Sequence, residues 1–299
     1  MITTHSQLIS TAITLVFSTQ SLSVVTPPRT AHDITENYFN HSTNCGSENK
    51  PAFLCSGVLL RATAVSDNYH SWDPSPQSLE SGGVSFSYLR KDAKFTRLAY
   101  GYKNGMIFYP HNKAPSDKDQ IEVLCAFPVD ADTVNREHKG CGYHAFYPAA
   151  SKSCRTMGIR TAHDWYQHYK SIDHNSHQHQ CGFDTQESAS RNGYYFLQSL
   201  EARRLMGYKF LSTQNELRLA SWQPGSPGKL PLQAFFYIDG GLSNAQHDQR
   251  DFYQQTGNVV PVIRLTLPTS LHSDATFNYR AGDQAVNAIP TVSKTNISG

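Results

Sequence analysis

The residues of this sequence that are best suited to chemistry are an arginine, a pair of serines and two glutamates, placed beside apolar runs. They are Arg61, Ser85, Ser87, Glu122 and Glu216. Arginine offers phosphate a planar and permanently charged fork, and serine hydroxyls can orient that fork and a carboxylate. A glutamate stabilises positive charge that develops at a sugar carbon, as carboxylates do in glycoside hydrolysis. The set therefore favours cleavage of a glycosidic bond in a phosphate-bearing substrate.

Each of the two glutamates belongs to a Gln-x-Glu motif at the head of an apolar, strand-like run. The motifs are Gln120-Ile121-Glu122 and Gln214-Asn215-Glu216. The spacing from the serines favours Glu122 as the catalytic residue, whereas the local motif favours Glu216, so both stay candidates. Gln120 and Gln214 are the accompanying candidates for substrate binding. Either glutamate would otherwise be an ordinary carboxylate on an edge strand.

The order of these parts along the chain is arginine, Ser-x-Ser and then Gln-x-Glu. It resembles the order in ADP-ribosyl-transferring enzymes and NAD glycohydrolases. NAD is anionic at its pyrophosphate, and its nicotinamide is already cationic and leaves without a general acid. The resemblance implies that Arg61 binds the phosphates, that Ser85 and Ser87 orient their neighbours, and that a glutamate stabilises the oxocarbenium ion. In the plainer interpretation, the arginine ends a strand at a surface ion pair and the serines face solvent.

Longer segments of the chain carry a second resemblance. They are residues 55–61, 72–76, 81–87, 121–128, 180–183, 214–218 and 248–253. These segments resemble those of the halovibrins, secreted bacterial proteins whose family activity is NAD glycohydrolysis. The resemblance implies an ADP-ribosyltransferase-like core, with NAD as the substrate and no cofactor. The chain departs from the wider transferase pattern in two places, because Arg61 is not in a Tyr-Arg-Gly setting and Ser85-Phe-Ser87 replaces Ser-Thr-Ser.

The first residue of each Gln-x-Glu motif bears on the choice between hydrolysis and transfer. Arginine-directed transferases of the superfamily typically have a glutamate there, so glutamine favours hydrolysis of NAD to ADP-ribose and nicotinamide. Two alternatives stay open. One is a mono-ADP-ribosyltransferase toxin with a protein acceptor, and the other is a non-enzymatic, disulfide-stapled secreted protein that binds carbohydrate or a cell surface.

Composition restricts the partners. The 299-residue chain has a net charge of +2 and only 17% charged residues, so it lacks the basic stripe expected of a nucleic-acid-binding protein. Its first residues include a short apolar run over 8–17 followed by small residues. That run suits a signal peptide and is too short to span a membrane. We therefore expect a secreted protein without stable membrane association, with a signal peptide over residues 1–23.

The cysteines support export. Their number is even, at six, and in an exported chain they predict three disulfides. Six cysteines allow 15 pairings, and we prefer pairing between sequence neighbours because it closes short loops. The preferred pairs are Cys45–Cys55, Cys125–Cys141 and Cys154–Cys181.

The alternation of apolar runs, turns and helical patterns predicts an α+β fold with mostly antiparallel strands and a few helices. Strands are expected at 52–61, 84–89, 121–129, 216–222, 231–238 and 259–267, a hairpin at 96–109, and helices at 161–171 and 188–205. The expected domain organisation is a polar lead-in over 24–44, one catalytic domain over 45–284 and a polar tail over 285–299.

Other chemical signatures are weak. The sequence has no GxGxxG, His-Glu-x-x-His or Gly-x-Ser-x-Gly motif, which disfavours a Rossmann fold, a zinc protease and a serine hydrolase. A histidine cluster over 173–179 could bind a metal, but it lacks a carboxylate at helical spacing and is better interpreted as a polar loop. No metal site is expected.

Overall fold

The structure is a computed structural model of the chain. It describes residues 27–46, 49–80, 82–114, 121–131, 140–141, 153–171, 180–205, 214–227 and 230–286. Within these ranges the fold is α+β, with one nine-stranded sheet and five α-helices. The expected α+β class, with mostly antiparallel strands and a few helices, is therefore confirmed. The predicted signal peptide, and the predicted tail beyond residue 286, lie outside the described residues.

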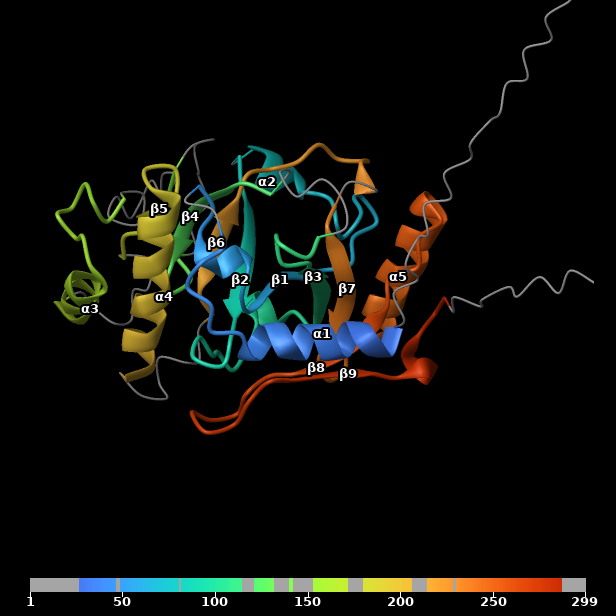
Figure 1. The fold of residues 1–299 in the computed structure, drawn as a ribbon. Coiled ribbons are helices and arrows are strands. Elements are labelled where there is room, and N and C mark those ends of the chain that lie inside the picture. Colours follow the sequence, from blue (N-terminus) through green and yellow to red (C-terminus); the bar gives the residue numbers. More distant parts are fainter. Residues whose placement is uncertain are drawn as a thin grey trace, which may run out of the picture.

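The sheet is the frame of the molecule, and its strands run in the order β5-β4-β6-β2-β1-β3-β7-β8-β9 (Figure 1). The strands are β1 (Val58–Thr63), β2 (Val84–Leu89), β3 (Asn104–Phe108), β4 (Val123–Phe127), β5 (Phe183–Asp184), β6 (Glu216–Leu219), β7 (Leu232–Tyr237), β8 (Val262–Thr266) and β9 (Thr276–Tyr279). Neighbouring strands pair antiparallel except β7 and β8, which are parallel. The three strands β6, β2 and β1 are thus immediate neighbours in the middle of the sheet.

Strands β1, β3, β7 and β8 bury apolar side chains on both sides because both faces of the sheet are covered there. Successive residues of a strand point to opposite faces, and here they enter two different hydrophobic clusters. One face carries Leu59, Met106, Phe235 and Val262, and the other carries Leu60, Ile107, Phe236 and Ile263. A smaller third cluster consists of Cys125, Phe127, Ala131 and Cys141. Burial on both faces explains why these strands appear in the sequence as mainly apolar segments.

The helices are α1 (Pro27–Phe39), α2 (Pro76–Glu80), α3 (Ala162–Ser171), α4 (Ala189–Leu205) and α5 (Leu242–Thr256). Residues of α3, α4 and α5 pack into the first hydrophobic cluster and so cover its face of the sheet. Figure 1 shows α4 beside β5 and β4, α3 on the outer side of α4, and α5 toward the other end of the sheet, beside β7. The predicted helices over 161–171 and 188–205 are confirmed, and each begins one residue later than predicted and ends at the predicted residue.

Helix α1 covers the opposite face, in the segment that the sequence presents as a polar lead-in. Its Ala31, Ile34 and Tyr38 belong to the second hydrophobic cluster, and α1 contacts β9 and β1. The Tyr38 hydroxyl donates to Asp274 and accepts from the backbone N–H of Ala275. This helix was not predicted from the sequence because it begins with two prolines and its apolar residues are few and widely spaced.

Several local expectations need correction. The predicted strand over 52–61 is divided into a 3-10 turn (Ala52–Leu54) and β1. The predicted hairpin over 96–109 contains only one strand, β3, preceded by a 3-10 turn (Ala99–Gly101). Helices α2 and α5 and the strands β5 and β9 were not predicted.

The three predicted disulfides are present with the preferred pairing. They are Cys45–Cys55, Cys125–Cys141 and Cys154–Cys181. The second joins β4 to the segment at residues 140–141, and the third joins the segment before α3 to the segment before β5. Among the residues that the structure describes, no helix is long and apolar enough to cross a lipid bilayer.

Candidate functional site

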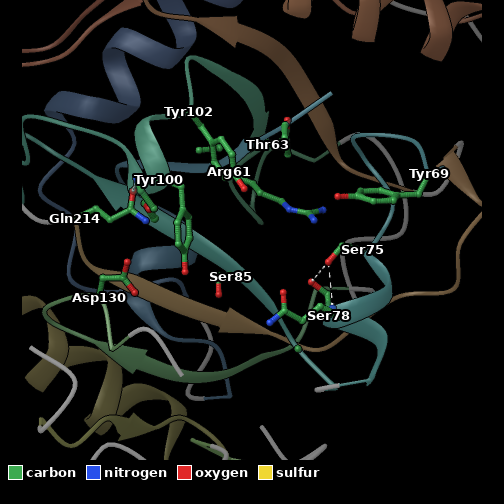
Figure 2. A pocket seen from close by; sticks show the side chains of 16 residues that line it. Arg61, Thr63, Tyr69, Ser75, Ser78, Ser85, Tyr100, Tyr102, Asp130 and Gln214 are labelled. Carbon is green, nitrogen blue, oxygen red and sulfur yellow. Dashed lines mark hydrogen bonds between the residues drawn. The ribbon is translucent and has the colours of Figure 1, made fainter. Parts of the chain in front are cut away.

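A cavity of about 190 Å³ opens to solvent where the predicted arginine and serines meet (Figure 2). Its lining comes from β1, β2, the segment 69–78, the turn 99–102, the segment that follows β4 and the segment that precedes β6. The lining residues are Arg61, Ala62, Thr63, Ala64, Tyr69, Ser75, Gln77, Ser78, Gly83, Ser85, Ser87, Ala99, Tyr100, Tyr102, Asp130 and Gln214. Four of the sequence-predicted site residues are among them: Arg61, Ser85, Ser87 and Gln214.

The floor of the cavity is a polar strip on one face of the sheet. Residues paired across antiparallel strands point to the same face, and Ser87 is paired with Leu60 while Ser85 is paired with Arg218. Leu60 belongs to the second hydrophobic cluster. On the far side, Arg218 is paired with Cys125 of the third cluster. The serines therefore lie between two apolar clusters.

The catalytic candidate Glu216 lies beside this floor and on the same face of the sheet, because it is two residues before Arg218, the residue paired with Ser85. The hydroxyl of Ser85 donates to Glu216 Oε1 at 2.6 Å, and the backbone N–H of Ala131 donates to Oε2 at 3.2 Å. Only 1% of the Glu216 surface is exposed, whereas Ser85 is exposed to the cavity. The negative charge of Glu216 thus reaches the cavity through the Ser85 hydroxyl, and burial makes its electrostatic effect stronger than in water.

The strand that carries Glu216 is held in register by its neighbour in the motif. The Asn215 side chain accepts from the backbone N–H of Tyr88 at 2.7 Å and donates to the Tyr88 carbonyl at 2.7 Å. Asn215 is fully buried, so these two bonds fix β6 against β2 at the level of the site. The middle residue of the motif is structural.

Gln214 fixes the roof of the cavity. Its side-chain Oε1 accepts from the backbone N–H of Ala99 at 3.1 Å. The next residue, Tyr100, is 76% exposed and has a φ of 52°, in the left-handed region. A bulky residue rarely adopts this conformation, and such strain concentrates at functional sites. Figure 2 shows the Tyr100 ring lying over the cavity with its hydroxyl directed toward Ser85 and Asp130.

Arg61 reaches the cavity from the other face of the sheet. It is paired with Met106, a residue of the first hydrophobic cluster. Its Nη1 donates to the Asp73 carbonyl at 2.9 Å, and its guanidinium lies 5.9 Å from the centre of the Trp222 ring. In Figure 2 it extends toward Tyr69, on the opposite side of the cavity from Gln214 and Asp130.

Burial dominates the electrostatics of this arginine. Arg61 is 8% exposed, and desolvation lowers its pKa to about 10, although Tyr69, Asp73 and Tyr102 oppose the shift. The group therefore stays cationic at neutral pH. Burial also raises the pKa of the Asp73 carboxyl, against the opposing effects of the Gly225 backbone N–H, His70 and Arg61. A partly desolvated cation beside hydroxyl groups suits an anion.

The segment that holds Arg61 is itself anchored. His70 Nδ1 lies 2.6 Å from Asp251 Oδ2 on α5, and the His70 ring stacks on Trp72 with centroids 4.6 Å apart. Asp73 accepts from the Gly225 backbone N–H at 3.2 Å. The carbonyl that orients the guanidinium is therefore fixed by contacts to two other parts of the chain.

Glu122, the other catalytic candidate, does not reach this cavity. It is exposed and accepts a hydrogen bond from Gln186 Nε2 at 3.0 Å. It lines a separate surface groove together with Lys50 and Thr185. Gln120 lies outside the described residues. The structure therefore brings one Gln-x-Glu motif, at 214–216, to the arginine and serines.

Several lining residues were not predicted from the sequence. The most notable are Asp130, Tyr100, Tyr102 and Tyr69. None of them stands in a recognisable motif, and each enters the cavity from a loop. The one signal that the sequence offered for the Tyr100 turn was the glycine after it, Gly101, which also has a positive φ.

The part of the chain that the structure describes contains one cluster with metal-ligand geometry, His32, Asp33 and Glu36 on the exposed surface of α1. It is remote from the cavity in sequence and shares no lining residue with it. The histidine cluster over 173–179 lies outside the described residues.

Comparison of the chain with models of known protein families gives no match, and comparison with curated proteins gives no match either.

Proposed function

We propose that this protein hydrolyses NAD at the bond between nicotinamide and ribose, giving ADP-ribose and nicotinamide. One observation carries the proposal: the Ser85 hydroxyl is bonded to the buried Glu216 carboxylate at the floor of a cavity that Arg61 also lines. The cavity thus offers a cation for the pyrophosphate and a buried negative charge for the ribose.

The roles follow from the chemistry. The Arg61 guanidinium, with hydroxyl groups of Tyr69 and Ser78 nearby in the lining, binds phosphate oxygens. Ser85 meets the ribose and transmits the charge of Glu216. As the bond to nicotinamide lengthens, positive charge grows at the anomeric carbon, and a fixed negative group stabilises that state more than the ground state.

The size of the cavity indicates how NAD is placed. At about 190 Å³, it is smaller than the roughly 300–1,000 Å³ of pockets that enclose a drug-sized ligand. It therefore encloses the nicotinamide ribose and part of the pyrophosphate, while the adenosine half extends into solvent. The exposed ring of Tyr100 is available to pack on the nicotinamide.

The position of Gln214 supports hydrolysis over transfer to arginine. Its Oε1 is engaged by the Ala99 backbone, so the residue serves to hold the roof, and it supplies no carboxylate for activating a protein acceptor.

The proposal extends to family and localisation. The arginine, the serines and the Gln-x-Glu motif lie on the adjacent strands β1, β2 and β6, which supports an ADP-ribosyltransferase-like core and the resemblance to halovibrins. The three disulfides support secretion, since such bonds persist in oxidising compartments.

The test is to incubate the purified protein, with its disulfides intact, with NAD and to quantify products by chromatography. We expect nicotinamide and free ADP-ribose in equal amounts. Nicotinamide without free ADP-ribose, together with labelling of an added protein, would indicate transfer. No nicotinamide release from folded protein would reject the proposal.

A further inference from the structure

Hydrolysis needs an activated water as well as a stabilised cation, and Glu216 is too deeply buried to contact one. We propose that Asp130 is the general base that takes a proton from the attacking water. The inference rests on the proposed function and adds a residue that the sequence motifs do not include.

Asp130 is in the right place for this role. It lines the same cavity as Ser85, and it is the one acidic residue among the described residues of that lining. It is half-buried, so water in the cavity can reach it. Figure 2 shows its carboxylate beside Gln214, across the cavity from Arg61. The phosphates are drawn to the Arg61 side, which leaves the ribose near Ser85 and Asp130.

The backbone around Asp130 is fixed relative to the Gln-x-Glu motif. The N–H of Asp130 donates to the Gln214 carbonyl at 2.8 Å, and the N–H of the next residue, Ala131, donates to Glu216 Oε2 at 3.2 Å. One short segment therefore supplies a solvent-facing carboxylate and a donor to the buried carboxylate.

The residues before Asp130 are anchored as firmly. Arg203 Nη1 donates to the Pro128 carbonyl at 2.8 Å, and the Gln180 side chain accepts from the Val129 N–H at 3.2 Å and donates to the Val129 carbonyl. Four consecutive residues, 128–131, are thus each bonded to a distant segment of the chain. A general base needs this kind of preorganised backbone. The charge of the fully buried Arg203 also interacts with that of Asp130.

The two carboxylates then have different tasks, as in glycoside hydrolysis. Glu216 accepts a hydrogen bond on each oxygen and stabilises charge. Asp130 faces the cavity and accepts the proton. In the step, the oxygen of water forms a bond to the anomeric carbon while the bond to the nicotinamide nitrogen breaks. The bonding electrons neutralise the nicotinamide, and the released proton passes to Asp130 and then to solvent.

The test compares Asp130→Asn with the wild type in water and in the presence of azide, an anionic nucleophile that needs no base. Because general-base catalysis typically contributes 10²–10⁴-fold, we expect hydrolysis to fall about 100-fold or more in Asp130→Asn. Azide should restore nicotinamide release from this variant and produce ADP-ribosyl azide. In Glu216→Gln, azide should restore little, because the charge-stabilising group is missing.

A matched control is Asp239→Asn, which changes an exposed aspartate on the turn after β7 and should leave turnover unchanged. Asp130→Asn with full hydrolytic activity would overturn the inference while leaving the proposed function intact. So would a low activity that azide rescues in neither Asp130→Asn nor Asp130→Ala, with melting temperatures near that of the wild type. A wild-type protein without nicotinamide release would instead reject the proposed function.

Discussion

The two Gln-x-Glu motifs are alike in sequence and lie in very different surroundings. Glu216 heads β6 and Glu122 immediately precedes β4. These two strands are neighbours and antiparallel. The heads of antiparallel neighbours lie at opposite ends, so the two glutamates are far apart along the same strand pair. The backbone confirms this, because Phe127 at the end of β4 is paired with Glu216, while the carbonyl of Glu122 accepts from Ala220 beyond the end of β6.

This difference shows that the Gln-x-Glu motif indicates the beginning of a strand, whereas the order of the strands in the sheet determines which residues surround the glutamate. Glu216 meets Ser85 because β6 lies next to β2. Strand β4 is one position further from β2, and Glu122 lies at its distant end. Figure 1 shows β4 on the side of β6 away from β2.

The sharpest way to break this comparison is Glu216→Gln, which removes the charge and nearly preserves the shape. We expect kcat to fall about 100-fold or more with a smaller change in KM, because the charge acts mainly in the transition state. The measurement is steady-state nicotinamide release, with thermal unfolding to check the fold. Nearly unchanged turnover in Glu216→Gln would remove this glutamate from the mechanism.

The arginine should give the next largest effect. Arg61→Lys keeps a positive charge but loses the planar guanidinium fork. It also loses the hydrogen bond that Arg61 Nη1 donates to the Asp73 carbonyl. Hydrogen bonds to charged groups contribute about 1.5–3 kcal/mol, so we expect kcat/KM to fall about 30-fold, mostly through KM. The matched control is Arg264→Lys, at an exposed ion pair with Asp239, which should leave kinetics unchanged. Equal kinetics in both variants would show that Arg61 does not bind the substrate.

Much of the sheet and two of its helices were predictable from the pattern of apolar residues in the sequence. Strands β4 and β7 appear as mainly apolar runs because both faces of the sheet are covered there, and β2 appears as an alternation of apolar and serine residues. Helices α3 and α4 were predictable because their patterns are helical. The disulfide pairs follow from short loops. Helix α1 and strand β9 were missed, since they pack on each other over the second cluster with few apolar residues in either.

The site was predictable only in its strand-borne parts. Arg61, Ser85 and Ser87 carry a recognisable order because each stands on a strand. The choice between the glutamates depended on strand order, which local patterns do not encode. Asp130 and Tyr100 come from loops whose positions are set by hydrogen bonds to Gln214, and such long-range contacts have no sequence signature.

Substitutions of Tyr100, in the roof of the cavity, should have a moderate effect on NAD binding. Removing the exposed Tyr100 ring in Tyr100→Ala leaves the floor intact, so we expect NAD affinity to fall about 5-fold, the range of one aromatic contact. Tyr100→Gly also loses the ring, but glycine adopts the left-handed backbone conformation of this position without strain. In residues with a side chain this conformation costs about 1–2 kcal/mol. The glycine variant should therefore unfold at a higher denaturant concentration than the alanine variant while showing similar kinetics. Wild-type affinity in both variants would show that the ring takes no part in binding.

The smallest effect is expected at Glu122, and it completes the comparison. Its side chain is exposed and its one described hydrogen bond, from Gln186 Nε2 at 3.0 Å, goes to an oxygen that glutamine also offers. Its backbone carbonyl continues to accept from Ala220 in any variant. Glu122→Gln should therefore change the free energy of unfolding by no more than about 0.5 kcal/mol, and nicotinamide release should match that of the wild type. Denaturant unfolding and the kinetic assay measure both quantities on the same preparation. A severe loss of turnover in Glu122→Gln, beside an active Glu216→Gln, would reverse the assignment and place the chemistry in the surface groove beside Lys50 and Thr185.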